Sequence, residues 1–477
     1  MNVIVVMLDS LRPDHLGCYG NPWIETPRID EFSEEAITFE RAYAEGMPTL
    51  PVRTALFTGS YTLMDRGWMH LKPEDALLAE VLWDSGYTTA LITDTYHLHK
   101  PRMAYERGFD YAFFIRGQEA DPYVVDPNVK VDLSKWHPKN YLTDHDKAVL
   151  IQYLKNIQHW RGEEDHFVAQ VVEAGINWLE SQIRRGRRDN LFLWLDSFDP
   201  HEPWDPPERY YDQYAPREYN DLPIIHPFIG GDEGGLVKHF TELEVKHIRA
   251  QYAGEVTMVD RWVGTFFDKV KELGLWDDTL IIVLSDHGEP LGEHGIIRKV
   301  RPWPYEELSR IVLIIKPPRN MWEGRGIRVK TFVQTPDIMP TILDSLKVCE
   351  SSRSRWSVSP RIQGLSLLPL ILGEEEKVRD YAIAGHYKRS WSIRDEDYSL
   401  YLWPTPRAYY TFGTRLIEEQ EKVNPELYRL RREYVPPKPD DWSLGEQPEK
   451  INILDEERDV AEDLELKLLR ELTKIRG

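Results

Sequence analysis

Cysteine is nearly absent from this chain of 477 residues, which contains only Cys18 and Cys349. Two cysteines cannot build a disulfide framework, and their separation does not match the paired spacing of a zinc site. We therefore expect both to be small, buried hydrophobic residues.

Long hydrophobic runs are also missing. No segment approaches the roughly 18 consecutive apolar residues that a membrane-spanning helix needs. The start of the chain has no basic segment, and Asp9 closes the opening apolar run of Val3–Leu8. We therefore expect no signal peptide, no membrane association and a cytoplasmic location.

Basic residues are in the minority, with 59 Lys and Arg against 80 Asp and Glu and a formal net charge of −21. Such an acidic balance argues against binding to nucleic acid or to anionic membranes, because both favour a basic surface. It leaves room for a small anionic substrate, which needs only a local basic pocket. The sequence does not determine the oligomeric state, and a homo-oligomer stays open.

What the sequence does contain is material for a large core, with 41% hydrophobic residues and 16 Trp, 24 Tyr and 15 Phe. This composition excludes a mainly disordered chain. At about 150 residues per domain, the length fits three units or one large α/β domain with a smaller one.

Short apolar runs alternate with segments of helical spacing. The runs, typical of strands buried on both faces, are Val3–Leu8, Thr88–Thr93, Leu191–Leu195, Thr279–Leu284 and Ile311–Ile315. The expected helices are Ile29–Ala36, Asp144–Ile157, His166–Arg185, Thr241–Leu273 and Asp337–Leu346. This alternation predicts the α/β class, with a large, mostly parallel sheet sandwiched by helices.

The composition changes after about Gly373. Asp380–Tyr410 is rich in Tyr and Trp and favours short antiparallel strands, and Asp455–Ile475 has the pattern of an amphipathic helix. We therefore expect a main domain over residues 1–375 and a smaller C-terminal α+β subdomain over residues 376–477.

Ionisable side chains follow four of the predicted strands, at Asp9, Thr93–His97, Asp196–His201 and Asp286–His287. Open α/β sheets bind their ligands beyond the carboxyl ends of the strands, so we expect these groups to meet at one edge. Carboxylates and an imidazole suit one divalent cation, which predicts a metal site at Asp9, Asp286 and His287.

A single aspartate at a strand end is more often a helix N-cap. The segments Ser285–Glu289 and Gly292–Gly295 favour the metal site, because two glycine-bounded turns there hold acids and histidines.

The segment Pro48–Gly59 has the pattern of a short helix, with Pro51 in its first turn and Gly59 at its end. Thr49 then lies at the helix N-terminus, where free N–H groups favour an alkoxide and an anionic substrate. Arg53, one turn further on, offers a fork for anionic oxygens. The alternative is that Thr49 is only an N-cap and Arg53 a surface charge.

Taken together, these motifs resemble the sulfatase family of the alkaline phosphatase superfamily. The family pattern of a nucleophile in C/S-x-P-x-R followed by T-G stands here as Thr49-x-Pro51-x-Arg53 with Thr58-Gly59. The other resembling segments are Leu8–Arg12, Leu16–Asn21, Asp199–Trp204, Ser285–Gly295, Tyr305–Glu307 and Gln363–Pro369. They occur in the family's order over about residues 1–375.

The resemblance implies a role for each matching residue. Asp9, Asp286 and His287 would bind the metal, with the Thr49 oxygen as a further ligand, and Arg53 would support the nucleophile. His201 would contact the substrate or help the leaving group; alternatively it fixes the turn between Pro200 and Pro203. The residues implied in the substrate pocket are Thr95, His97 and either Lys299 or Arg301, between which spacing does not decide.

The departures from the family pattern bear on the chemistry. Sulfatases oxidise Cys or Ser at the nucleophile position to formylglycine, whereas oxidation of Thr49 would give a ketone. Ser10 replaces a second acidic ligand of many sulfatases, Thr95 replaces a pocket Lys, and His287 stands where many have Asn. Thr and His at these places look more like phosphonate monoester hydrolases and phosphodiesterases, which tend to favour Mn²⁺ or Zn²⁺ over Ca²⁺.

These departures favour a metal-dependent hydrolase of phosphate mono- or diesters or of phosphonate esters, with Thr49 forming a covalent intermediate. The expected partner is a small anionic ester. The alternatives are a sulfuric ester hydrolase, a phosphotransferase or mutase, and a non-catalytic binding protein.

Overall fold

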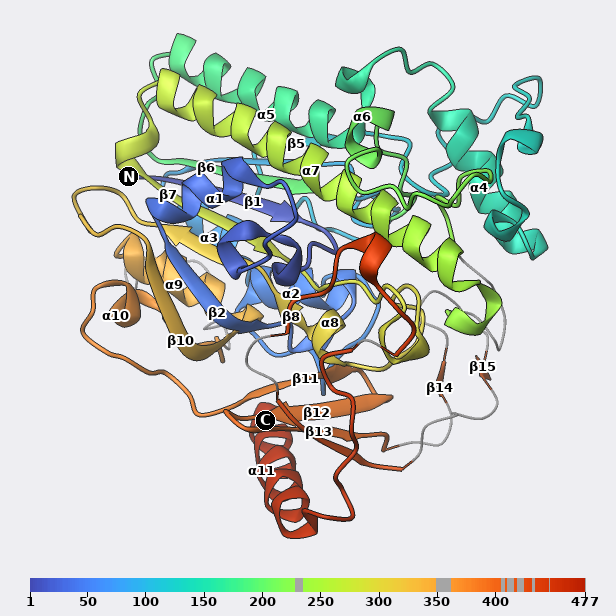
Figure 1. Cartoon of the computed structure of the whole chain (residues 1–477). Helices are drawn as coiled ribbons and strands as arrows, with labels where there is room; N and C mark the ends of the chain where they lie inside the picture. Colours follow the sequence, from blue (N-terminus) through green and yellow to red (C-terminus); the bar gives the residue numbers. More distant parts are fainter. Residues whose placement is uncertain are drawn as a thin grey trace.

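The computed structural model describes residues 1–227, 235–348, 362–404, 424–430, 434–445 and 447–476, with the backbone of 408–409 and 416–417. Within these residues, nine strands form a central sheet (Figure 1). The strands are β1 (Asn2–Leu8), β2 (Ile37–Tyr43), β4 (Thr88–Thr93), β5 (Tyr111–Phe114), β6 (Leu191–Ser197), β7 (Thr279–Ser285), β8 (Arg310–Ile311), β9 (Leu313–Lys316) and β10 (Ile327–Gln334).

The strand order is β10-β2-β9-β7-β1-β6-β4-β5, with β8 paired beside β2. The pairs from β7 through β1, β6 and β4 to β5 are parallel, and β10 is parallel to β2. Strand β9 is antiparallel to both of its neighbours, and β8 is antiparallel to β2. The predicted mostly parallel sheet is therefore confirmed.

Helices cover both faces of this sheet. They are α1 (Pro27–Glu34), α2 (Thr49–Thr58), α3 (Leu78–Asp84), α4 (Asp144–Asn156), α5 (Phe167–Arg184), α6 (Glu208–Tyr211), α7 (Glu242–Glu272), α8 (Glu306–Ser309), α9 (Ile338–Ser345) and α10 (Leu368–Ile371). The ends of the five helices expected from the sequence lie within two residues of the observed ones.

Strand β1 shows how the sheet is buried on both sides. Its residues Ile4 and Val6 pack on the face covered by α1, α4, α5 and α7, and Figure 1 shows α5 and α7 side by side there. Val3, Val5 and Met7 pack on the opposite face, with α2, α3, α9 and α10. Alternate side chains of a strand point to opposite faces, so a strand covered on both sides needs the continuous apolar run seen in the sequence.

The register of the central strands aligns their carboxyl ends. Leu8 is paired with Ser197 of β6 and with Ser285 of β7, and Thr93 is paired with Asp196. The residues that follow these strands therefore emerge at one level, beside one another.

A second sheet carries the C-terminal region. It consists of β3 (Gly46–Met47), β11 (Ala382–His386), β12 (Ser390–Arg394), β13 (Tyr398–Leu402) and β16 (Glu426–Arg429), in the order β16-β13-β12-β11-β3. Helix α11 (Arg458–Arg476) packs on it through Leu464 and Leu468, as Figure 1 shows at the lower end of the molecule. A separate pair joins β14 (Ala408–Tyr409) to β15 (Leu416–Ile417).

The structure has strands β11–β13 and helix α11 where the sequence predicted C-terminal strands and a helix, although residues 405–407 and 410 of the predicted strand region lie outside the described residues. The domain boundary at 375/376 stays a prediction. Strand β3, from the N-terminal part of the chain, belongs to the same sheet as β11, so the two parts share a sheet.

Cys18 is half-buried rather than fully buried, and Cys349 lies outside the described residues. Among the helices that the structure describes, none has the length and apolarity to cross a membrane.

Candidate metal centre and active site

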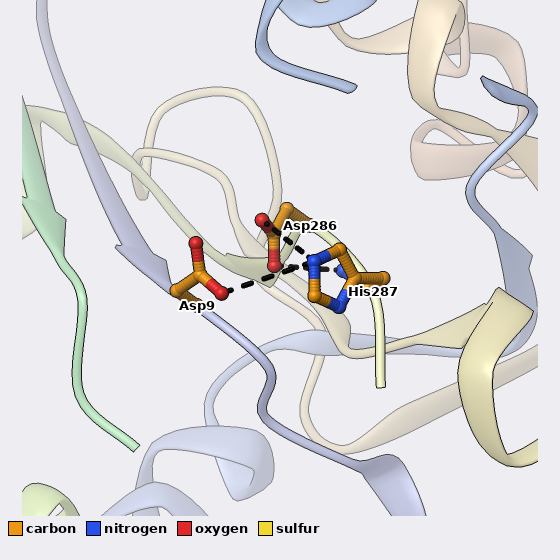
Figure 2. Close-up of side chains that lie close together, drawn as sticks. All are labelled: Asp9, Asp286 and His287. Atoms are coloured by element: carbon orange, nitrogen blue, oxygen red, sulfur yellow. Dashed lines mark hydrogen bonds and ion pairs between the residues drawn. The ribbon is translucent and has the colours of Figure 1, made fainter. Parts of the chain in front are cut away.

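Asp9, Asp286 and His287 converge at the carboxyl ends of β1 and β7, and Figure 2 shows their side chains turned toward one another. The Nε2 atom of His287 lies 3.4 Å from Asp286 Oδ2 and 3.9 Å from Asp9 Oδ1. All three side chains are fully buried. The structure thus brings together the three residues that the sequence predicted as metal ligands.

The ring of His287 is held in one orientation by a backbone contact. Its Nδ1 lies 2.7 Å from the carbonyl oxygen of Gly288, which can only accept, so Nδ1 carries the proton. Burial lowers the pKa of His287 to about 4, which keeps the ring neutral. The lone pair of Nε2 therefore faces the two carboxylates and Thr49, whose Oγ1 is 3.4 Å away.

Thr49 is the first residue of helix α2, as predicted. The helix ends at Gly59, whose φ of 65° is the left-handed conformation that glycine adopts most easily. Every residue of α2 is buried, so the helix is fixed in the core. The start of a helix favours negative charge, and Thr49 stands at that start.

Arg53 is fully buried, and its guanidinium group is occupied by carboxylates. Its Nε and Nη2 donate to the two oxygens of Asp196 over 2.9 and 2.6 Å. Its Nη1 lies 2.7 Å from Asp286 Oδ2 and 3.1 Å from Asp9 Oδ2. The guanidinium group that the sequence suggested for substrate oxygens thus binds Asp196 instead. It also contacts Asp9 and Asp286, the predicted ligands that follow β1 and β7.

The two predicted metal-binding carboxylates have different proton affinities. Burial and the neighbouring charge of Asp286 raise the pKa of Asp9 well above its ordinary value. Burial alone would also raise the pKa of Asp286, but His287 and Arg53 hold it below its ordinary value. Within the described part of the chain, Asp9 Oδ2 has the ion pair with Arg53 but no contact with hydrogen-bond geometry.

These residues fit a divalent cation. Ligand atoms about 2.0–2.5 Å from one ion stand about 3–4 Å from one another, which matches the spacing of the three side chains. The buried carboxylates Asp9, Asp286, Asp196 and Glu289, when ionised, outnumber the cations Arg53 and Lys299 by two charges. A divalent ion balances this excess, which would otherwise be costly in a buried site.

Lys299 is buried beside the predicted metal ligands. Its Nζ lies 3.3 Å from Ser10 Oγ, which donates to Asp9 Oδ1 over 2.9 Å, and 3.1 Å from Glu289 Oε2. Lys299 is therefore in contact with the residues around Asp9. Arg301 lies with its guanidinium group 5.7 Å from the ring centre of Trp303.

His201 follows β6 in a turn with cis peptide bonds before Pro200 and Pro203. Its Nδ1 donates to the carbonyl of Glu202 over 2.6 Å, so the backbone contact of the structural alternative is present. Nε2 keeps its lone pair and is the reactive side of the ring. Burial, with Lys299 and Arg298 nearby, lowers the pKa of His201 well below its ordinary value.

Thr95 and His97 follow β4 on the other side of Arg53. Thr95 Oγ1 donates to Asp196 over 3.0 Å and lies 3.4 Å from Arg53 Nη2. His97 Nε2 lies 3.3 Å from Glu119 Oε2, and its Nδ1 accepts from Lys100. Both residues thus contact the groups that surround the centre, and Glu119 also lies near His201.

Two residues of the site were not assigned a role from the sequence. Asp196 was noted only as one of several strand-end acids, and its pairing with Arg53 depends on the fold. Tyr252 of α7 donates to the carbonyl of Ser10 over 2.8 Å and accepts from Arg12 N over 3.0 Å. It thereby holds the turn after Asp9, where Ser10 has a φ of 62°; a tyrosine in a long helix gives no sequence signal of this kind.

Comparisons with known proteins identify the family of this chain. A family model described as Sulfatase matches residues 1–348. An arylsulfatase of Clostridium perfringens is 28% identical over 472 residues, covering 91% of this chain and 92% of its own. A multifunctional alkaline phosphatase superfamily protein, PehA of Trinickia caryophylli, is 27% identical over 452 residues, covering 83% of this chain and 81% of its own.

Among solved structures, a phosphonate monoester hydrolase of Agrobacterium radiobacter has a similar fold, with a TM-score of 0.70 at 20% identity. The alignment covers 100% of this chain and 96% of that one. The resemblance predicted from the motifs is confirmed by the family match, which extends over well more than half of the chain. The chain belongs to the sulfatase family, whose members are ester hydrolases of the alkaline phosphatase superfamily.

Proposed function

We propose that this protein is a metal-dependent hydrolase of phosphate or phosphonate esters that uses Thr49 as its nucleophile. One observation supports this most: the Thr49 hydroxyl, at the N-terminus of α2, lies 3.4 Å from His287 Nε2 in a buried centre with Asp9 and Asp286. Its expected partner is a small anionic ester. A cytoplasmic location is kept as part of the proposal.

Asp9, Asp286 and His287 would hold one divalent cation, with the Thr49 oxygen as a further ligand. When bound, such a cation lowers the pKa of an alcohol and withdraws charge from a phosphoryl oxygen. The imidazole ligand favours Mn²⁺ or Zn²⁺ over Ca²⁺, which prefers oxygen ligands throughout.

The residues of the chain have separate tasks in this proposal. Thr49 Oγ1 loses its proton to water and attacks phosphorus, so that a bond forms from this oxygen to phosphorus and the bond to the leaving oxygen breaks. Lys299 and the first-turn N–H groups of α2 stabilise the charge on the non-bridging oxygens. His201, whose Nε2 lone pair is free in the resting ring, takes up a proton there and gives it to the leaving oxygen. Water then attacks the phosphothreonine, releases the phosphate or phosphonate and restores Thr49.

Arg53 has a supporting task because its donors are used by Asp196, Asp286 and Asp9. It fixes the positions of these carboxylates and of the Thr49 turn, whose carbonyl lies 3.4 Å from its Nη1. We propose that Lys299, rather than Arg301, contacts the substrate anion.

The threonine supports phosphorus over sulfur for a chemical reason. Sulfatases expel sulfate by collapse of a hydrated aldehyde, which needs two hydroxyl groups on one carbon, and an unmodified Thr49 has only one. A sulfated threonine would have to be cleaved by water. A phosphothreonine allows a second in-line attack at phosphorus.

A sulfuric ester hydrolase is the second candidate, because the matching family model is that of sulfatases and a relative similar over most of the chain is named an arylsulfatase. The two proposals differ in the central atom of the substrate. The fold is similar to that of a phosphonate monoester hydrolase, and the sequence is similar to that of a multifunctional alkaline phosphatase superfamily protein. These similarities are compatible with a phosphorus ester hydrolase and with a sulfuric ester hydrolase.

A matched set of substrates decides between them. The para-nitrophenyl esters of phosphate, of phenylphosphonate and of sulfate, with the bis ester of phosphate, share one leaving group. The proposal expects the highest kcat/KM on a phosphorus ester, dependence on added Mn²⁺ or Zn²⁺, and loss of activity in Thr49→Ala. A highest kcat/KM on the sulfate ester would contradict it.

A further inference from the structure

A histidine from the C-terminal region lies against the strand that leads into the nucleophile helix. Strand β11 is parallel to β3, with Gly385 opposite Gly46 and His386 opposite Met47. Pro48 and Thr49 follow Met47 directly. His386, at the end of β11, is therefore held next to the entrance of α2.

The two strands are fixed closely together. Gly385 N donates to the carbonyl of Glu45 over 2.9 Å. A Cβ on Gly385 would lie 2.1 Å from the carbonyl oxygen of Ser390, and a Cβ on Gly46 would lie 2.1 Å from Thr62 Oγ1. Both glycines thus let neighbouring segments pack closely on the paired strands. The pairing of β11 with β3 fixes His386 beside Met47, two residues before Thr49.

The imidazole of His386 is buried and only partly satisfied. Its side chain is 2% exposed, and Nδ1 lies 3.3 Å from Ser390 Oγ. Nε2 has no hydrogen-bond partner among the described residues. A buried polar atom without a partner is unfavourable, so its presence next to a reaction centre points to a ligand.

The surroundings of His386 keep its ring neutral. Burial, together with Arg389 and the nearby His287, lowers the pKa of His386 to about 3. The ring is then neutral. When the Ser390 hydroxyl donates to Nδ1, Nε2 carries the proton and can donate to an anion.

We propose that His386 is a substrate-contacting residue whose Nε2–H donates a hydrogen bond to an anionic oxygen of the ester bound at Thr49. The C-terminal region thereby completes the site that β1, β7 and α2 begin. This inference rests on the proposed function only in taking Thr49 as the position of the reacting ester.

The experiment compares His386→Ala and His386→Gln with Ser392→Ala, a control in the same sheet. Ser392 is buried on β12, and its hydroxyl donates to the carbonyl of Ala384. We expect His386→Ala to lower kcat/KM by about tenfold or more and to raise the inhibition constant of inorganic phosphate. His386→Gln, whose amide can donate, should recover part of both, and Ser392→Ala should change neither.

Metal content and thermal unfolding show whether each variant is intact. An intact His386→Ala protein with unchanged kcat/KM and unchanged phosphate inhibition would overturn the proposal. If this variant does not fold, the wild-type protein is labelled with 15N at its histidines, and its NMR spectrum is recorded with and without inorganic phosphate. The His386 signal should move when phosphate is added while that of His294 stays; an unmoved His386 signal overturns the proposal.

The failure of this inference differs from the failure of the proposed function. If the sulfate ester is the preferred substrate, the proposed function is wrong, and His386 is tested with that ester and with inorganic sulfate. The same losses in His386→Ala would then still support its contact with the anion.

Discussion

The hydroxyl oxygen of Thr49 and Nε2 of His287 lie 3.4 Å apart, although 238 positions separate these residues in the chain. The first residue comes from the start of α2 and the second from the end of β7. Their contact joins the predicted nucleophile to the predicted metal ligands in the buried interior, where electrostatic interactions are strong.

Replacing Arg53 should destabilise the protein as well as inactivate it. In Arg53→Met, the fully buried carboxylate of Asp196 loses its two-pronged partner. Removing one partner of a buried ion pair costs about 3–5 kcal/mol, so the free energy of unfolding in urea should fall by about that amount. Arg319→Met is the control, because its pair with Asp277 is exposed and should contribute less than about 1 kcal/mol. Equal losses in both variants would contradict the role of Arg53.

Removing the hydroxyl of Tyr252 should weaken metal binding. Tyr252→Phe leaves the Ser10 carbonyl and the Arg12 N–H without their common partner, so the turn that positions Asp9 loosens. Losses of such outer contacts typically lower metal affinity by about 10- to 100-fold, measurable by calorimetric titration with Mn²⁺ or Zn²⁺.

Tyr214→Phe is the matched control for this measurement. The Tyr214 hydroxyl contacts Thr257, which lies in α7 like Tyr252, and accepts from the N–H of Glu25. These contacts are away from the turn after Asp9. An affinity that falls equally in both variants would show that Tyr252 acts only through stability.

The effect of His201 should depend on the leaving group. As the group that protonates the departing oxygen, it matters little for para-nitrophenolate, which leaves as a stable anion, and much for an alcohol. His201→Ala should therefore lower kcat by about 10²-fold or more on an alkyl or phenyl ester and far less on the para-nitrophenyl ester. The same loss on both substrates would assign His201 to the turn rather than to proton transfer.

His294 should make stability depend on pH. Burial alone would lower its pKa, but Glu307, 2.8 Å from its Nδ1, and Glu449 raise the pKa of His294 above its ordinary value. The folded state then holds a proton that the unfolded state releases. This stabilisation is complete below the unfolded value of about 6.5 and is lost as the pH rises through the folded value.

Urea unfolding across this range tests the expectation. Between the two pKa values the wild type should lose up to about 1.4 kcal/mol per pH unit relative to His294→Gln. Parallel pH profiles of the two proteins would show that His294 is neutral in the folded state.

The sequence predicted the centre of the fold better than its margins. β1 and β7 are covered on both faces, so their apolar runs are continuous and easily recognised. β2 and β10 were not predicted, because charged residues interrupt their apolar runs. In β2 these are Glu40 and Arg41, and in β10 they are Arg328 and Lys330. These strands lie toward the edge of the sheet, where one end or face meets solvent.

The same limit applies to the site. Asp9, Asp286 and His287 were predicted because each follows a buried strand, and Thr49 because it begins a helix. Asp196 and His386 gained their significance only from partners far away in the chain. The pattern of apolar runs in a sequence shows which residues lie at the end of a strand. It does not show which of the carboxylates there pairs with a buried arginine, as Asp196 does with Arg53.

The most direct test of the account is the chemical state of residue 49 during turnover. The protein is quenched in acid while it hydrolyses a saturating phosphorus ester, and the peptide that contains Thr49 is analysed by mass spectrometry. The account predicts the added mass of one phosphoryl group on Thr49, absent from Thr49→Ala. An unmodified Thr49 throughout turnover, together with a Thr49→Ala variant that keeps the wild-type kcat, would contradict it.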